Sequence, residues 1–211
     1  MGMFSEALQI RKGVTAVIGG GGKTGLLYRL AGELPGSVIL CTTTHIFPPP
    51  HLPVVQRTEA VQGVICVGTP CETGKLTAPR QPISELAALA DYVLVEADGS
   101  KHLPLKAHLP HEPVIPPEAE QVICVVGASG LNRPVALAAH RPERFALLAG
   151  SELADPPAVA RVLEREALHH RVFINQADSP ERIAAALALA KLLRCPVVVA
   201  SLQKGEILCS Y

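Results

Sequence analysis

Short runs of apolar and β-branched residues recur along the chain, and most are separated by a segment with the apolar spacing of a helix. The runs expected to be strands are 14–18, 37–41, 64–67, 92–95, 122–126, 171–174 and 197–200. Helices are expected at 5–10, 26–34, 84–90 and 142–148, and from 155 and 180 onward. Strands without polar interruptions are typical of a parallel sheet that is covered on both faces. The alternation therefore predicts an α/β fold with three layers and a mainly parallel central sheet.

A glycine-rich loop follows the first predicted strand and precedes a clear helix pattern. It consists of Gly19, Gly20, Gly21, Gly22, Lys23 and Thr24. Glycines allow backbone N–H groups to converge on an anion, and the N-terminus of the next helix adds positive potential. In P-loops the lysine contacts the terminal phosphates and the hydroxyl binds Mg²⁺. The loop therefore predicts a phosphate site for a nucleotide, and the alternative is a β-to-α turn without a ligand.

The loop departs from the full P-loop pattern in its length. Val17 stands where G-x-x-x-x-G-K-[ST] has its first glycine, so the loop has the compact form G-x-x-G-K-T. This compact form resembles the loop of Mur-type ligases. The resemblance implies a second interpretation, a kinase or ligase that activates a small carboxylate or selenium species through a phosphorylated intermediate.

Two acidic residues follow the strand predicted at 92–95. Glu96 and Asp98 lie at its carboxyl end, and Gly99 completes a spacing similar to the D/E-x-x-G element of GTPases. A carboxylate in this position, downstream of a P-loop, suits Mg²⁺ coordination beside nucleotide phosphates. We expect Glu96 and Asp98 to hold Mg²⁺ or its waters and to act with Lys23 in catalysis. The alternative is a solvated strand end.

Four further residues are candidates for contacts with a substrate. Thr44 and His45 follow the second predicted strand, at the edge where α/β sheets bind ligands. Lys101 and Lys106 lie in the long segment 100–117, and loops of this length in compact domains tend to be functional. We expect this segment to be a mobile lid whose lysines contact phosphates or an anionic substrate.

A third element suggests contacts to a nucleotide base. The segment 175–178, Asn-Gln-Ala-Asp, resembles the guanine-reading N-K-x-D motif of GTPases, with Gln176 in place of the lysine. Ser201 falls where GTPases read the guanine oxygen with a backbone amide. Asn175, Asp178 and Ser201 are therefore candidate base contacts, and the missing lysine leaves both GTP and ATP open. The alternative is that Asn and Asp are ordinary turn residues.

Composition narrows the class of protein. The formal net charge is +0 and there is no basic block, which argues against nucleic-acid or anionic-membrane partners. The 6 cysteines form no C-x-x-C pair, so reduced thiols in a cytoplasmic protein are expected. No signal-peptide core and no membrane-spanning run is found. The 211 residues are expected to form a single domain, 1–211, with a small hairpin insertion at about 54–82.

The order of several motifs is similar to that of the YqeC-like family. These motifs lie at 20–24, 42–49, 95–101, 104–106 and 111–116. Members of the family are described as accessory proteins for selenium-dependent molybdenum hydroxylases. The resemblance implies nucleotide binding in the service of selenium or molybdenum cofactor biosynthesis, with a molybdenum hydroxylase or another maturation protein as partner.

Together these features predict a P-loop NTPase-like domain that binds Mg²⁺ with GTP or ATP and that hydrolyses the nucleotide slowly or transfers its phosphate. Two other functions use the same residues. A ligase would release phosphate only with an acceptor present. A non-enzymatic chaperone or scaffold would bind Mg-nucleotide tightly without turnover.

Overall fold

The computed structural model describes residues 2–211 and divides the chain into two compact units. Each unit is assembled from separate stretches of sequence. The first contains residues up to 18, 24–99 and 113–122, and the second contains 19–23, 100–112 and 123–211. The central sheet has nine strands and is mainly parallel. The predicted α/β class and the mainly parallel sheet are therefore confirmed.

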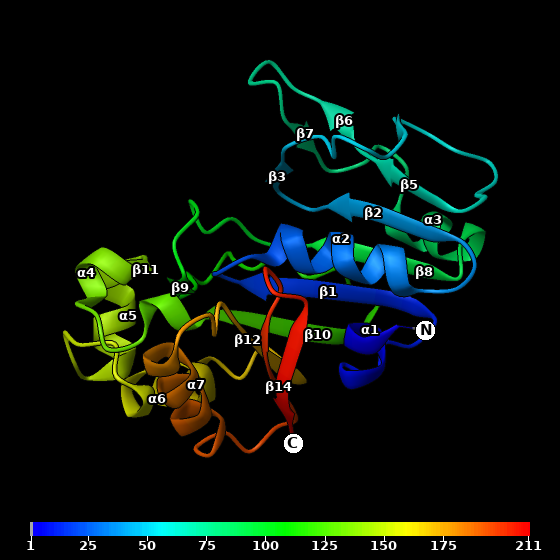
Figure 1. Ribbon diagram of the computed structural model, residues 1–211. Coiled ribbons are helices and arrows are strands. Elements are labelled where there is room, and N and C mark those ends of the chain that lie inside the picture. The colour runs from blue at the N-terminus through cyan, green and yellow to red at the C-terminus, as the bar shows by residue number, and fades with distance from the viewer. Residues whose placement is uncertain (1) are drawn as a thin grey trace. The chain divides into compact units, whose positions relative to one another are not determined.

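The first unit holds five strands of this sheet in the order β1-β8-β2-β5-β4 (Figure 1). Their bounds are Gly13–Gly19 for β1, Val38–Thr42 for β2, Val54–Val55 for β4, Val64–Val67 for β5 and Tyr92–Glu96 for β8. All neighbouring pairs are parallel. Helices α1 (Met3–Ala7) and α3 (Ile83–Leu89) lie in the first unit. Helix α2 (Lys23–Glu33) belongs to it from Thr24 onward.

A small antiparallel sheet also belongs to the first unit. Its order is β3-β7-β6, with bounds His45–Ile46 for β3, Thr69–Pro70 for β6 and Leu76–Thr77 for β7. Within the range 54–82, where a small hairpin insertion was expected, β6 and β7 form a hairpin. Strands β4 and β5 from the same range belong instead to the central sheet.

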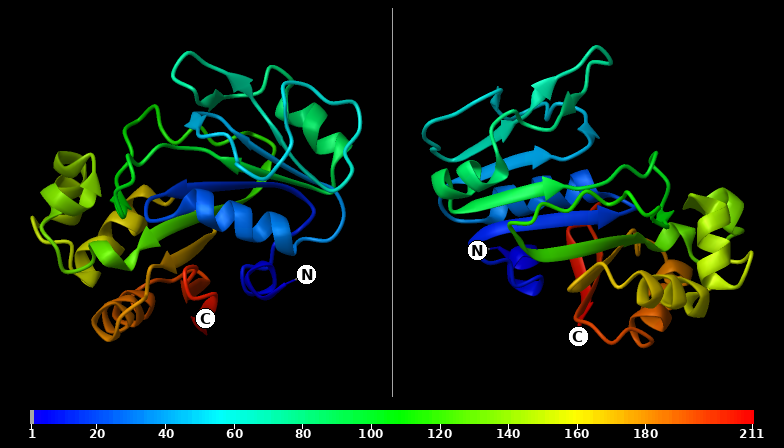
Figure 2. Two further views of the ribbon diagram at one scale, coloured as in Figure 1. Left: turned by 45° about the horizontal axis from the view of Figure 1, so that its top comes forward. Right: turned by 180° about the vertical axis from the view of Figure 1, so that it is seen from behind.

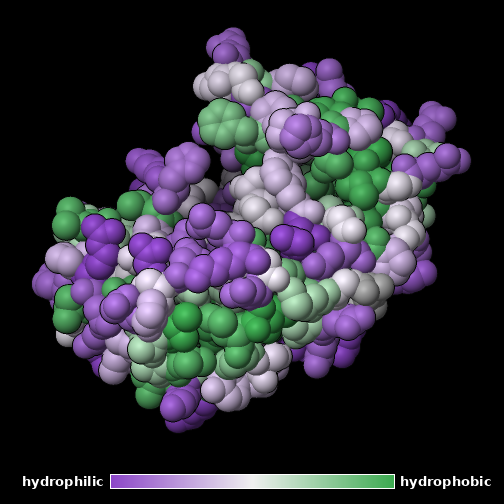
Figure 3. Space-filling model, in the orientation of Figure 1, coloured by the Kyte–Doolittle hydropathy of each residue, from purple (hydrophilic) through white to green (hydrophobic). Residues whose placement is uncertain are grey.

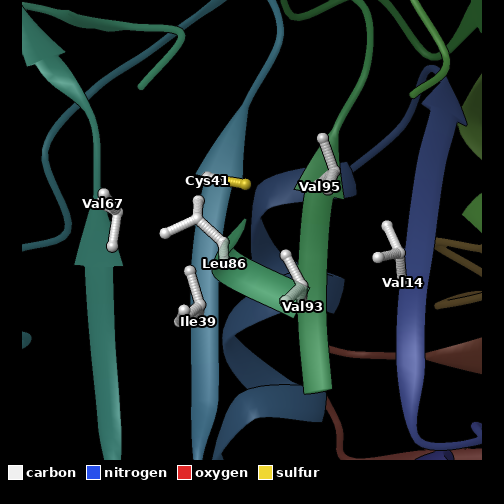
Figure 4. Close-up of a cluster of buried hydrophobic side chains, with 7 residues drawn as sticks. All are labelled: Val14, Ile39, Cys41, Val67, Leu86, Val93 and Val95. Atoms are coloured by element: carbon white, nitrogen blue, oxygen red, sulfur yellow. The ribbon is translucent and has the colours of Figure 1, made fainter. Parts of the chain in front are cut away.

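The core of the first unit contains seven side chains that pack between the strands and α3 (Figure 4). They are Val14, Ile39, Cys41, Val67, Leu86, Val93 and Val95. Ile39 is in register with Val93, and Cys41 with Val95. Because alternate residues of a strand point to the same face, these four side chains form two rows, against which Leu86 of α3 packs. Burial raises the pKa of the Cys41 thiol well above its usual range, so the thiol stays neutral and packs as a small apolar group.

Asp91 connects the beginnings of three parallel strands in the first unit. Its carboxylate accepts hydrogen bonds from Lys12 Nζ at 2.7 Å and from the Ser37 N–H at 3.0 Å. Its carbonyl oxygen accepts from the Gly13 N–H at 2.9 Å. Lys12 and Ser37 directly precede β1 and β2, and Asp91 directly precedes β8. The three strands therefore begin level, and their carboxyl ends reach the same edge of the sheet.

The second unit contains the strand order β14-β13-β12-β10, in which only the β13–β14 pair is antiparallel. The bounds are Ala119–Gly127 for β10, Arg171–Asn175 for β12, Val197–Ser201 for β13 and Glu206–Ser210 for β14. A separate parallel pair is formed by β9 (Leu105–Lys106) and β11 (Ala139–His140). The helices are η1 (Ala128–Gly130), α4 (Val135–Ala138), α5 (Pro142–Ala149), α6 (Pro156–Glu166) and α7 (Pro180–Ala190).

Helices α5, α6 and α7 of the second unit begin at the sequence signals expected for them, whereas η1 and α4 were not predicted. The Asp155 carboxylate accepts the N–H of Ala158 at 2.8 Å and caps α6, with Pro156 as its first residue. Helix α6 packs against α5 and α7 (Figure 2). Hydrophobic side chains gather over α7 and β14 on the face shown in Figure 3. Strand β14 was not predicted, because its apolar run is only three residues long and its five residues alternate between exposed and half-buried.

No helix among residues 2–211 combines the length and the apolar character needed to cross a membrane. All six cysteines are free thiols, and those at 41, 66 and 124 are buried. Burial raises the pKa of the Cys66 thiol to about 11.

Replacing Asp91 with Asn should destabilise the protein at neutral pH, because it removes the charged acceptor of Lys12 and Ser37. The hydrogen bond from Lys12, with those from Ser37, lowers the pKa of Asp91 to about 2. A lowered native-state pKa contributes stability above the unfolded-state pKa, and this stability is lost as the pH falls toward the native value. The difference in unfolding free energy between Asp91→Asn and wild type should therefore be constant above about pH 5 and shrink from about pH 4 toward pH 2. Urea denaturation at several pH values measures it, and a difference still constant at about pH 3 would contradict this role.

Candidate functional site

The carboxyl ends of three strands lie in one row in the first unit. Glu96 at the end of β8 is in register with Val17 of β1 and with Thr42 at the end of β2. The Glu96 carbonyl oxygen accepts the Thr42 hydroxyl at 2.8 Å and the Thr43 N–H at 3.1 Å. These bonds fix the backbone at the point where the acidic side chain leaves the sheet.

Glu96 contacts the first turn of α2. Thr24 Oγ1 donates a hydrogen bond to Glu96 Oε2 at 2.8 Å. Glu96 is 7% exposed, and Asp98, two residues further on, is 1% exposed. Carboxylate and hydroxyl oxygens are the hard donors that Mg²⁺ prefers, so Thr24 and the two carboxylates fit this ion chemically. Among residues 2–211 no group of three or more His, Cys, Asp or Glu side chains is arranged to hold a metal ion by itself.

Thr44 and His45 occupy different environments. The Thr44 N–H donates to Thr42 Oγ1 at 2.9 Å, so Thr44 lies in the turn that follows β2. His45 is exposed and begins β3, where it pairs with Thr77 of the small sheet. Thr44 is thus tied to the row of strand ends, whereas His45 belongs to the hairpin region.

The glycine loop lies in the second unit, and its backbone is held from two sides. The Gly20 N–H donates to Val125 O at 2.9 Å, and the Gly21 N–H donates to Leu103 O at 3.1 Å. Lys23 Nζ folds back onto Gly19 O at 2.7 Å. Two of the amides expected to contact phosphates therefore bind protein carbonyls. The donors suited to an anion are the Lys23 ammonium and the N–H groups at the start of α2, because a first helical turn has no internal acceptors for them.

All four glycines of the loop are required by packing. A Cβ at Gly19 would overlap Val125 O, and one at Gly21 would overlap the backbone of Gly127. A Cβ at Gly20 would lie 2.6 Å from Leu103 O, and one at Gly22 would lie 2.6 Å from Asn175 Nδ2. The glycine content of the loop is therefore explained by close contact with backbone at Gly19–Gly21 and with the Asn175 side chain at Gly22. The case for phosphate depends on Lys23, Thr24 and their partners.

The three residues predicted to read a base come together in the second unit. Asn175 Nδ2 donates to Gly21 O at 2.8 Å, and Asn175 Oδ1 accepts the Leu202 N–H at 3.1 Å. Ser201 Oγ donates to Asp178 Oδ1 at 2.5 Å. Asn175 thus connects the glycine loop to the end of β13, and Asp178 is held by the last residue of that strand.

A polar cavity of about 430 Å³ adjoins these residues. It is lined by Ser129, Asn175, Gln176, Asp178, Arg182 and Gln203. The prediction missed three of these lining residues, Ser129, Arg182 and Gln203. Arg182 lies 3.5 Å from Asp178 Oδ2, one helical turn after it, and this i,i+4 spacing was a signal that could have identified it.

The two lysines of the segment 100–117 differ in exposure. Lys101 is exposed and has a left-handed backbone with φ of 50°. Lys106 lies in β9 with its side chain fully buried, and its Nζ donates to Glu112 Oε2 at 2.7 Å. Lys106 is therefore part of a buried ion pair, and Lys101 is the lysine of this segment that faces solvent.

Comparison with known proteins matches residues 15–143 to the family described as YqeC protein. The chain is also 38% identical over 160 residues to "Uncharacterized protein YqeC" of Escherichia coli (strain K12). That alignment covers 67% of this chain and 62% of the relative, so the chain spans less than two thirds of that relative's length. The matched range of the family includes the glycine loop and the acidic strand end, while the residues around the polar cavity from 175 onward lie beyond it.

Replacing Asn175 with Asp should destabilise the protein by about 1–3 kcal/mol, because a carboxylate cannot donate to Gly21 O and Asn175 is only 5% exposed. Urea denaturation measures the loss. Asn132→Asp, the same chemical change at an exposed residue, is the matched control and should change stability little. Equal effects of the two substitutions would show that Asn175 does not hold the loop.

Proposed function

The chain belongs to the YqeC family, and we propose that it is an Mg-nucleotide-binding accessory protein with slow NTPase or phosphoryl-transfer activity. The main support for this proposal is the hydrogen bond between Thr24 and Glu96. The Thr24 hydroxyl, directly after Lys23 in the chain, bonds to the buried Glu96 carboxylate at the end of the neighbouring parallel strand. A lysine, a hydroxyl and a strand-end carboxylate in this relation are the groups that P-loop proteins use for phosphate and Mg²⁺.

The proposed phosphate contacts come from Lys23 and from the N–H groups at the start of α2. The Lys23 ammonium is buried against Gly19 O, where it is positioned at the mouth of the glycine loop. Mg²⁺ would be held by Thr24 with Glu96 and Asp98 or their waters. This set of oxygen donors is incomplete without phosphate oxygens, as is usual for Mg²⁺ that binds together with a nucleotide. The strand–loop–helix arrangement also supports a P-loop NTPase-like assignment of the fold.

The proposed base site is the polar cavity beside Asn175 and Asp178. Asn175 spans from the glycine loop to the end of β13, so the base site and the phosphate loop share one hydrogen-bonded residue. Asp178 is an acceptor at the cavity wall, and an acceptor of this type suits the N–H groups of a guanine edge. GTP is therefore the favoured nucleotide, and ATP is the alternative that binding measurements distinguish.

The proposed pathway follows from the family resemblance described above. An accessory protein for selenium or molybdenum cofactor maturation would couple nucleotide binding to the loading of a partner, either a molybdenum hydroxylase or another maturation protein. The acidic strand end and the glycine loop both lie within the family match. They are the part of the chain on which this coupling would act.

Replacing Lys23 with Ala should weaken Mg-nucleotide binding about ten- to a hundred-fold, because one charge-assisted phosphate contact is lost. Isothermal titration with Mg-GTP and Mg-ATP measures the affinity, and circular dichroism checks that the variant is folded. Lys191→Ala removes the same charge from an exposed position after α7 and should leave affinity unchanged. A folded Lys23→Ala protein that binds like wild type would contradict the phosphate assignment.

Replacing Asp178 with Asn should weaken GTP binding about ten-fold or more and improve binding of xanthosine triphosphate, whose additional carbonyl accepts a hydrogen bond from an amide. Competition binding with the Mg complexes of GTP, ATP and xanthosine triphosphate measures the change. Glu181→Gln removes the same charge from the first turn of α7 and should leave the order of affinities as in wild type. If wild type binds GTP and ATP equally and Asp178→Asn changes neither, the guanine assignment is wrong while the phosphate site stands.

A further inference from the structure

Four polar residues of the second unit form a cluster outside the proposed nucleotide site. They are Lys106, Glu112, His140 and Arg141. Strands β9 and β11 bring them together, because Lys106 and His140 are register partners in this parallel pair. The Ala107 N–H donates to His140 O at 3.1 Å and extends the pairing. Side chains of register partners lie on the same face, so the ammonium and the imidazole are neighbours.

Glu112 connects the two cations of the cluster. Its Oε2 accepts from Lys106 Nζ at 2.7 Å, and its Oε1 accepts from Arg141 Nε at 3.1 Å. Burial would raise the pKa of Glu112, but the hydrogen bonds from Lys106 and Arg141 outweigh burial and lower it. The carboxylate is therefore ionised at neutral pH. Glu112 therefore bridges two cations in a place where charges are costly to bury.

His140 adds an unsatisfied polar atom to the cluster. The residue is only 9% exposed, and its Nδ1 is buried without a hydrogen-bond partner among residues 2–211. Burial lowers the pKa of His140, and the charges of Lys106 and Arg141 lower it further. The imidazole is therefore neutral at neutral pH. Buried polar atoms are almost always hydrogen-bonded, so an exception of this kind indicates a missing partner.

Arg141 combines backbone strain with an open side chain. Its φ of 65° and ψ of 57° are left-handed, a conformation that is unfavourable for a residue with a long side chain. The side chain is 40% exposed, and its described hydrogen bond uses only Nε. A guanidinium has four further N–H donors on its two Nη atoms, and these form the planar fork that suits an oxyanion.

We propose that Arg141, His140, Lys106 and Glu112 form a binding site for a small carboxylate- or phosphate-bearing anion. The Nη groups of Arg141 contact the anion, and Glu112 orients Arg141 and Lys106. The His140 imidazole supplies a further hydrogen bond when the anion is bound. A strained arginine backbone, a buried ion pair and an imidazole nitrogen without a hydrogen-bond partner each lower stability. Stability of the fold alone therefore does not explain them.

The location of the cluster suits a substrate that binds in addition to the nucleotide. Leu103 O and Pro104 O accept the N–H groups of Gly21 and Gly127, and β9 follows directly after these residues. The backbone that supports the glycine loop therefore continues into the cluster. The proposal itself does not depend on nucleotide binding, because it is carried by residues outside the loop.

Titration of ¹⁵N-histidine-labelled protein with inorganic phosphate, and separately with acetate, tests the site by NMR. His140→Gln identifies the His140 ring signals. In wild type these signals should shift saturably with at least one of the two anions. Arg141→Gln should weaken that response about ten-fold or more, because a bidentate charged contact is lost. Arg144→Gln removes the same charge from helix α5, which Arg141 directly precedes. Arg144 Nε donates to His108 O, and the substitution should weaken the response less than about two-fold.

Two further variants make the outcome decisive. Arg141→Gly keeps the left-handed backbone without strain, so it should remain folded while losing the response to anions. Lys23→Ala should keep the His140 response, which separates this site from the phosphate loop even if the loop binds no nucleotide. The proposal is overturned if the His140 signals do not shift in wild type, if Arg141→Gln and Arg144→Gln weaken the response equally, or if Lys23→Ala abolishes it.

Discussion

The close approach of backbone segments at the glycine loop is the constraint on which the rest of the site depends. A side chain at any of Gly19–Gly22 would meet the backbone of β10 or of the segment after Ser100, or the amide of Asn175. Without side chains the loop can donate its Gly20 and Gly21 N–H groups to Val125 O and Leu103 O, in the neighbouring segments of the second unit. Within the second unit Lys23 then folds back onto Gly19 O. Within the first unit Thr24 contacts Glu96.

The second requirement is that several strands end at the same level. In the first unit Asp91 ties the starts of β1, β2 and β8 together, and the parallel register then brings Thr42 and Glu96 into one row. In the second unit the register of β10 and β12 brings Gly127 level with Asn175. Parallel strands gather their functional residues at one edge only if their starts are aligned, because every strand advances by the same rise per residue. The hydrogen bonds of Asp91 at the start of the strands therefore help to position Thr42 and Glu96 at their carboxyl ends.

Features that lower stability, namely backbone strain and buried charge, lie close together in the second unit. Segment 100–112 contains two residues with left-handed backbones, Lys101 and His102, and ends in the carboxylate that bridges Lys106 and Arg141. Strain and buried charge lower stability, and they persist where the surrounding structure holds them in place. Here the surroundings are the pair β9–β11 on one side and the glycine loop on the other, all within the second unit.

Local patterns in the sequence determined seven strands of the central sheet, most helices, the Asp155 cap and the glycine loop with the acidic end of β8. The strands are β1, β2, β5, β8, β10, β12 and β13. Each of these is set by neighbours within a few residues, through apolar periodicity, turn chemistry or capping. The tertiary structure alone decided which partners distant residues have. It joined Lys106 to Glu112 and Arg141, and it assigned two loop amides to protein carbonyls. It also paired β14 with β13, although its alternating residues carry a weak signal by themselves. Hydrogen bonds and ion pairs between distant residues depend on strand order and register, and no local pattern encodes these, because both arise from the packing of the whole sheet.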